Sequence, residues 1–125
     1  MNVKSKNLFV RVDAGVQIGD GHFLRCLTLA NSLKKKFDQI IFISNQLPKH
    51  FIKKIKRDNF KIYKINGYTH IQKEKLEKKL KTQLIHNDLV ETKKIIGKYK
   101  NSTNWLIIDH FGIDHFWEKN VRVNI

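Results

Sequence analysis

A histidine follows two glycines in the segment Gly19–His22, near the start of the chain. Glycine lets a ligand approach the backbone closely, and a neutral imidazole can accept a proton from water near physiological pH. Arg25 adds a fixed positive charge one helical turn later, and Asp13 can orient His22 or bind a sugar hydroxyl. These residue types predict proton-transfer chemistry on a ligand that carries negative charge or hydroxyl groups.

A strand and a helix must position this loop. The apolar run Leu8–Val12 predicts a buried strand, and the spacing of apolar residues predicts a helix over Phe23–Lys36. In an open α/β sheet, ligands bind beyond the carboxyl ends of the strands, and the free N–H groups at a helix start favour anions. We therefore expect His22 to face a ligand-binding crevice and to stay neutral, because the positive helix end disfavours the imidazolium form.

The glycine spacing by itself is a weak signal, because it also fits a tight turn in which His22 only caps the helix. A dinucleotide-binding fingerprint needs a third glycine and an acidic residue after the next strand. Here His22 follows the second glycine, and the next strand ends in Ser44 and Asn45. The chain contains no Gly-Lys-Ser/Thr sequence either, so it lacks the signature of a phosphate-binding P-loop.

Further strands and helices alternate along the chain. The expected strands are Ile40–Ser44, Phe60–Ile65 and Trp105–Asp109. The expected helices begin after Pro48, within the Lys/Glu-rich stretch 67–82, at the cap Asp88 and at the cap Asp114. This alternation predicts an α/β fold with an open, parallel, Rossmann-like sheet. The basic residues within Phe60–Ile65 place that strand at an edge.

The composition indicates one folded domain over residues 1–125. Of the 125 residues, 41% are hydrophobic and 29% are charged. The single cysteine, Cys26, cannot form an internal disulfide, and no apolar run is long enough to span a membrane, so we expect a cytoplasmic protein without a membrane partner. The net charge of +14 comes mainly from lysines spread along the chain, without a nucleic-acid-binding signature, so no nucleic-acid partner is expected.

Three segments resemble one known family. The opening, with Arg11-x-Asp13, Ile18–His22 and Arg25–Leu27, resembles that of the bacterial UDP-2,4-diacetamido-2,4,6-trideoxy-β-L-altropyranose hydrolases, which spore-coat polysaccharide biosynthesis proteins share. Asn87–Thr92 resembles the family's Asp-Ala-x-x-Thr stretch, and Trp105–Asp114 resembles its strand and loop ending in Asp-His-Tyr-Gly. The order and spacing of the three segments agree with the family, and together they span nearly the whole chain.

The resemblance implies a glycosyltransferase-B-like architecture, in which two Rossmann-like domains face each other across a cleft. It also implies hydrolysis of a UDP-linked sugar at C1, which releases UDP and the free diacetamido sugar for pseudaminic acid synthesis. His22 matches the family's catalytic histidine, which activates or positions the attacking water. The residues that match the substrate-binding loops are Arg11, Asp13, Gly19, Gly21, Arg25, Asp109, His110 and Phe111.

Two features depart from the family pattern. Phe111 stands where the family usually has tyrosine, which removes a hydroxyl able to bond the sugar or the water. Family members are about twice as long, in keeping with two domains. The resemblance therefore covers an N-terminal domain, and the second domain, with most of the uridine and diphosphate contacts, is expected on a companion chain.

Other functions stay open. A nucleotide-sugar glycosyltransferase of the same two-domain type also carries a glycine-rich loop and a histidine after its first strand, and a non-catalytic basic fragment would account for Phe111 and the charge. No cofactor is expected, and no metal site, because His110 and His115 are not spaced as a convincing metal pair. Trp105 and Trp117 are expected to pack inside the protein rather than to stack on a sugar.

Overall fold

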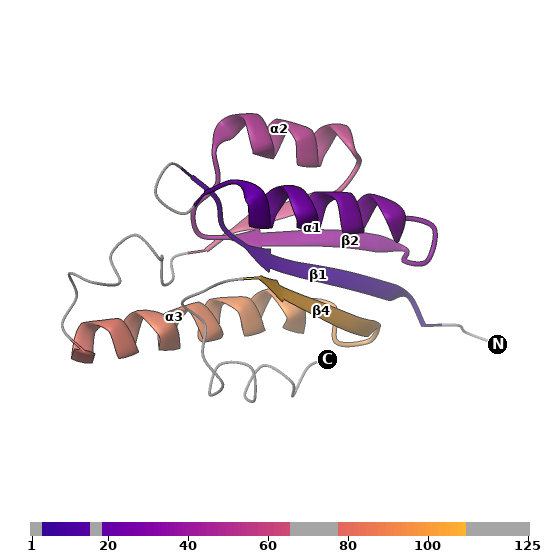
Figure 1. Cartoon of the computed structure of the whole chain (residues 1–125). Coiled ribbons are helices and arrows are strands. Elements are labelled where there is room, and N and C mark those ends of the chain that lie inside the picture. Colours follow the sequence, from indigo (N-terminus) through magenta and orange to yellow (C-terminus); the bar gives the residue numbers. More distant parts are fainter. Residues whose placement is uncertain (1–3, 16–18, 66–77, 110–125) are drawn as a thin grey trace.

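The computed structural model describes residues 4–15, 19–65 and 78–109 of the chain. Strands and helices alternate along these residues (Figure 1). Their bounds are β1 Lys6–Val12, α1 Gly21–Ser32, β2 Gln39–Ser44, α2 Lys49–Arg57, β3 Lys61–Lys64, α3 Lys78–Gly97 and β4 Thr103–Asp109. The strands of this described part form one sheet in the order β3-β2-β1-β4, and every neighbouring pair is parallel. The fold is the Rossmann-like α/β architecture that the sequence predicts.

Helices cover both faces of this sheet. α1 and α2 lie on one face, and α3 lies on the other (Figure 1). The chain steps from β1 to β2 and β3 in one direction, and α3 then returns it to the far side of β1, where β4 pairs. The strand order therefore reverses between β1 and β4. In open α/β sheets, ligands bind at the carboxyl ends of the strands at such a switch point.

The central strand β1 is buried on both faces, which explains its nearly unbroken apolar sequence. Side-chain alternation places Leu8, Val10 and Val12 in the core beneath α1 and α2, and Phe9 in the core beneath α3. Arg11 shares the α3 face with Phe9, although it is charged. A cation in the centre of a sheet needs a buried partner, and the fold supplies one from α3.

Phe23 joins α1 and α2 to the sheet. Its side chain is fully buried, and its ring stacks on Phe51 with the centroids 4.4 Å apart. We expect Phe23→Ala to lower the free energy of unfolding by about 3–5 kcal/mol, because the surrounding rings cannot close the cavity. Urea denaturation measures this loss. Leu29→Ala, at an exposed position of the same helix, is the control and should change stability by less than about 0.5 kcal/mol.

The structure confirms several of the expected elements. β3 lies at an edge of the sheet, as its basic residues predict, and Cys26 is buried in α1. His50 and His86 are exposed, as scattered surface histidines should be. α1 ends at Ser32, earlier than predicted, and the chain turns through the exposed lysines that follow Leu33. Those lysines have no apolar stripe to pack on the sheet, so nothing extends the helix across them.

Two sequence predictions are wrong. Asp88 does not cap a helix; its buried side chain lies within the continuous helix α3. Helical spacing puts Asp88 on the same face as Ile85, Leu89 and Thr92, all of which are buried, so packing on the sheet carries the helix through this position. Trp105 is 56% exposed rather than packed, because β4 is an edge strand of the described sheet.

The predicted helix at Asp114 and the side chain of Trp117 lie outside the described residues. Among the helices that the structure describes, none combines the length and the apolar character needed to cross a membrane.

Candidate active site

The loop between β1 and α1 is closed at its base by a backbone hydrogen bond. The Gly19 N–H donates to the Gly15 carbonyl oxygen at 2.7 Å, so the chain returns to its starting point before α1 begins. Gly19 has a φ of 89°, in the left-handed region that glycine adopts without strain. This closure places Gly21 and His22 in the first turn of α1, next to the carboxyl end of β1.

Arg25 holds the ring of His22. Its Nη2 lies 2.9 Å from His22 Nδ1. A guanidinium has donors and no acceptor, so Nδ1 accepts this hydrogen bond and the proton of the neutral imidazole is on Nε2. The guanidinium also bends back over the helix start, with Nη1 3.9 Å from the point where a Cβ on Gly21 would lie. His22 is half-buried and Arg25 is exposed, so both can meet a ligand from solvent.

The first turn of α1 carries no acidic residue, and the side chain of Asp20 at the N-cap makes no capping hydrogen bond. The N–H groups of the helix start are therefore not hydrogen-bonded by that side chain, although the Asp20 carboxylate offsets part of their positive charge. Together with Arg25, these N–H groups create a cationic corner beside His22. Such a corner suits phosphate groups, which take hydrogen bonds from backbone N–H groups and from guanidinium.

Below this corner lies a buried network of charges. Arg11 is fully buried; its Nη1 donates to Asp13 Oδ1 at 2.9 Å, and its Nε donates to Asp88 Oδ1 at 3.1 Å. Arg11 Nη2 donates to the second oxygen of Asp88, so guanidinium and carboxylate form a two-pronged pair. Burial lowers the pKa of Arg11, but the Asp13 and Asp88 carboxylates raise it by more, so its pKa lies above the ordinary value. Arg11 is therefore a permanent cation inside the protein.

Asp13 joins two loops at the carboxyl edge of the sheet. Its Oδ1 accepts hydrogen bonds from Ser44 Oγ at 2.8 Å, from the Asn45 N–H at 2.8 Å and from the Gln46 N–H at 3.1 Å. The Ala14 N–H in turn donates to the Gln46 carbonyl oxygen at 3.0 Å. The loop after β1 and the loop after β2 are thus fastened to each other through one carboxylate.

These positions differ from the substrate contacts that the resemblance implies for Arg11 and Asp13. Both side chains are buried, and their described bonds are to other protein groups. Arg11 has no exposed surface and Asp13 very little, so neither can make an extensive ligand contact unless the protein rearranges. In this structure the two residues hold the edge of the sheet together, whereas Gly19, Gly21, His22 and Arg25 form its accessible part.

The third segment of the resemblance, Trp105–Asp114, reaches the same edge. Asp109 is the last residue of β4 and pairs in register with Val12, one residue before Asp13. The carboxyl ends of β1 and β4 therefore lie side by side, at the switch point. His110 and Phe111, which the resemblance places in the substrate-binding loop, lie outside the described residues.

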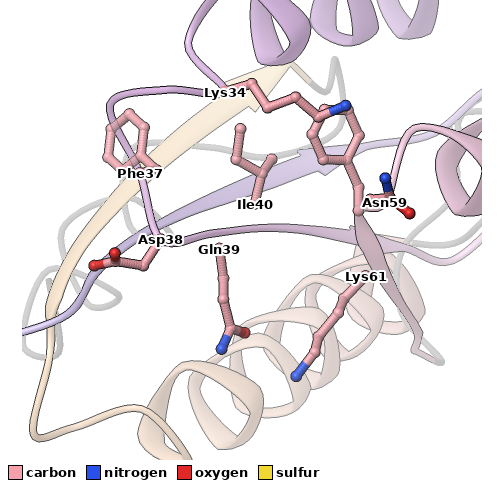
Figure 2. Close-up of a pocket in the computed structure, with 8 residues that line it drawn as sticks. Lys34, Phe37, Asp38, Gln39, Ile40, Asn59 and Lys61 are labelled. Atoms are coloured by element: carbon pink, nitrogen blue, oxygen red, sulfur yellow. The ribbon is translucent and has the colours of Figure 1, made fainter.

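The surface of the described residues has hollows at both edges of the sheet. A small pocket of about 110 Å³ lies between Phe37, Ile40 and Lys61, at the amino ends of β2 and β3 (Figure 2). It is on the opposite edge of the sheet from His22. An open depression of about 420 Å³ runs along α1 past Arg25 and Leu29, beside the cationic corner.

The described residues contain no group of three His, Cys, Asp or Glu side chains able to hold a metal ion.

Sequence reasoning missed the role of Asp88. Two signals were present: Asp88 and Thr92 continue the helical spacing of Ile85, Leu89 and Ile96, and Arg11 interrupts an apolar strand that must be buried. A buried cation in a strand and a carboxylate on a buried helix face are expected to pair. Neither signal says which helix covers which strand, so the pairing itself needed the tertiary structure.

Comparison with known proteins identifies one relative among curated proteins. The chain is 31% identical over 111 residues, or 88% of its length, to an uncharacterized protein, MJ1062, of the archaeon Methanocaldococcus jannaschii. The match covers 18% of that relative, so the chain spans less than a fifth of its length. No family model matches the chain. No solved structure matches it either.

Proposed function

We propose that the chain is the N-terminal, glycosyltransferase-B-type domain of a UDP-sugar hydrolase that acts on a UDP-linked 2,4-diacetamido-2,4,6-trideoxy sugar in pseudaminic acid biosynthesis. One observation carries the proposal: two of the three segments that resemble this family include the carboxyl ends of β1 and β4, which are adjacent and parallel at the switch point of the sheet. Far apart in sequence, these strand ends meet where an open α/β fold binds its ligand. The cationic corner at His22 and Arg25 matches the charge of a nucleotide diphosphate.

His22 and Arg25 have separate roles in this proposal. The diphosphate draws the Arg25 guanidinium, because a doubly charged phosphate acceptor binds guanidinium more strongly than a neutral imidazole does. His22 Nδ1, which accepts a hydrogen bond from Arg25 in the structure, then becomes available to water. Substrate binding and water activation are thereby linked through one side chain.

Hydrolysis then needs one displacement at C1. The water oxygen attacks C1 while its proton passes to His22 Nδ1. The bond between C1 and the phosphate oxygen breaks, and UDP leaves with the bonding electron pair. The first turn of α1 and Arg25 stabilise the negative charge that grows on the leaving diphosphate. The products are UDP and the free sugar.

Removing the Arg25 side chain tests the link between the two roles. We expect Arg25→Ala to raise KM for the UDP-sugar about tenfold or more, since a charge-assisted hydrogen bond to phosphate contributes roughly 1.5–3 kcal/mol. Steady-state kinetics of UDP release measure this change. Arg57→Ala, which removes an exposed arginine on α2, is the matched control and should leave KM unchanged. An unaltered KM in Arg25→Ala would remove Arg25 from the substrate site.

The proposed activity is tested directly with the UDP-linked diacetamido sugar. The chain is assayed alone and together with a companion chain that carries the second domain, in water labelled with ¹⁸O. Release of UDP with the label in the free sugar supports hydrolysis at C1. Label in the phosphate of UDP would show attack at phosphorus, and transfer of the sugar to an added acceptor would favour a glycosyltransferase. A lack of UDP release in both assays would favour a non-catalytic fragment.

A further inference from the structure

A series of buried hydrogen bonds connects α3, along the face of β1 that α3 covers, to the edge of the sheet that carries the candidate site. It begins with Asp88, whose two carboxylate oxygens accept hydrogen bonds from the Arg11 guanidinium. Asp88 Oδ1 also accepts a hydrogen bond from Thr92 Oγ1 at 3.4 Å. The Arg11 side chain lies on the α3 face of β1, and its Nη1 donates a hydrogen bond to Asp13, the residue that follows the strand. Asp13 holds the backbone of the β2–α2 loop, and it directly precedes the loop that leads to His22. α3 is therefore bonded, from the opposite face of the sheet, to the loops at the carboxyl edge.

We propose that Asp88 is a positioning residue for the site. It holds the Arg11 side chain in place, and Arg11 holds the Asp13 carboxylate, which determines the relative position of the β1–α1 and β2–α2 loops. Asp88 touches no substrate and acts entirely through Arg11. The catalytic consequence rests on the proposed function, whereas the loop arrangement can be measured without it.

The charge of Arg11 is the essential link. Asp13 Oδ1 accepts hydrogen bonds from Arg11 Nη1, from Ser44 Oγ and from two backbone N–H groups, and Arg11 is the cation among these donors. Without that cation, a buried carboxylate must either take up a proton or move toward water. Either response weakens the hydrogen bonds from Asn45 and Gln46. Those two N–H groups therefore report on the arrangement of the loops.

A purely structural role makes a different prediction. A buried ion pair can often be replaced by apolar side chains of similar volume with no loss of stability. The double variant Arg11→Met/Asp88→Leu therefore tests positioning, because it fills the space of the Arg11–Asp88 pair and leaves the Asp13 carboxylate without its cation. If the network only filled the core, this variant would retain native loops and native activity.

The experiment combines hydrogen exchange by NMR with kinetics on the double variant. We expect the Asn45 and Gln46 amides to exchange about tenfold faster or more, as for local opening, while amides in the core of β2 keep their protection. We also expect kcat/KM for the UDP-sugar to fall roughly 100-fold, the effect of a small misplacement of catalytic groups. The urea midpoint should lie between those of Asp88→Ala and the wild type, because no buried cation is left unpaired but the Asp13 carboxylate has lost its cation.

A matched control changes a buried polar pair at the other end of the same strand. Asn7 Nδ2 donates to Asn104 Oδ1 at 3.2 Å, at the amino ends of β1 and β4. In Asn7→Leu/Asn104→Leu, exchange of the Asn45 and Gln46 amides and kcat/KM should match the wild type, whatever happens to the urea midpoint. Accelerated exchange in this control as well would mean that the loops respond to any core change, and it would overturn the proposal.

Native exchange at Asn45 and Gln46 in the double variant would likewise overturn the positioning role. If the double variant does not fold, Asp88→Asn takes its place, since it keeps the size of the side chain and removes its charge. Unchanged exchange in that variant has the same meaning. If the wild type hydrolyses no UDP-sugar, the proposed function fails, and the exchange rates still decide whether Asp88 positions the loops.

Discussion

Replacing His22 with alanine is expected to lower kcat for UDP-sugar hydrolysis by about 100- to 10,000-fold, the contribution of a general base. The ring sits in the first turn of α1 at the switch point, with Nδ1 bonded to Arg25 and accessible once that arginine turns to phosphate. The first turn contains no acidic residue that could replace His22 as the base, and the Asp20 carboxylate lies before that turn, at the N-cap. Initial rates of UDP release at saturating substrate measure the effect.

Two further variants make this result interpretable. His22→Gln can still accept a hydrogen bond from Arg25 but cannot take a proton from water near neutral pH. It should be as slow as His22→Ala if proton transfer matters, and close to the wild type if the ring only positions its neighbours. His86→Ala removes an exposed histidine of α3 and should keep full activity. Wild-type turnover in His22→Ala would refute the catalytic role.

Replacing Asp88 with alanine is expected to lower the free energy of unfolding by about 3–5 kcal/mol, as for breaking a buried ion pair. The change leaves the fully buried Arg11 guanidinium without the carboxylate that binds it at two points. Asp13 remains as a partner, but it meets the guanidinium through Nη1. A buried cation that loses one of its two carboxylate partners must draw in water or distort the strand that carries it.

Urea denaturation followed by circular dichroism measures this loss. The control is Asn87→Ala, at the neighbouring exposed position of the same helix, where a change of less than about 0.5 kcal/mol is expected. An Asp88→Ala protein as stable as the control would mean that the ion pair contributes little to folding. In contrast, Arg11→Met/Asp88→Leu should recover part of the stability, because no buried cation is left without its partner, although the Asp13 carboxylate then lacks its cation.

The sheet, its parallel pairing and most element positions follow from local patterns. Leu8–Val12 and Ile40–Ser44 are apolar runs of strand length, and the chain between them has helical spacing, so short-range preferences and burial agree. The edge position of β3 follows from its alternating lysines. The glycine loop and its histidine are likewise recognisable, because they lie within a few residues of one another.

The error at Asp88 has a definite origin. Aspartate favours helix starts in general, and sequence shows no reason to prefer a buried place for it. Only the packing of α3 on β1 brings Asp88 to Arg11, 77 positions apart in the chain. In the folded protein Arg11 and Asp13, which the resemblance implies as substrate contacts, are buried. The exposure of Trp105 also depends on which strand is the neighbour of β4.

Local patterns in the sequence predict the alternation of strands and helices and the loop that carries His22, because both depend on the order of neighbouring residues. Only the folded chain shows that the carboxyl ends of β1 and β4 lie side by side, and that a carboxylate of α3 supports the loop after β1 through Arg11. The physical reason is that these relations join residues distant in the chain. Their proximity depends on the strand order and on the burial of opposite charges, and no pattern of neighbouring residues predicts either one.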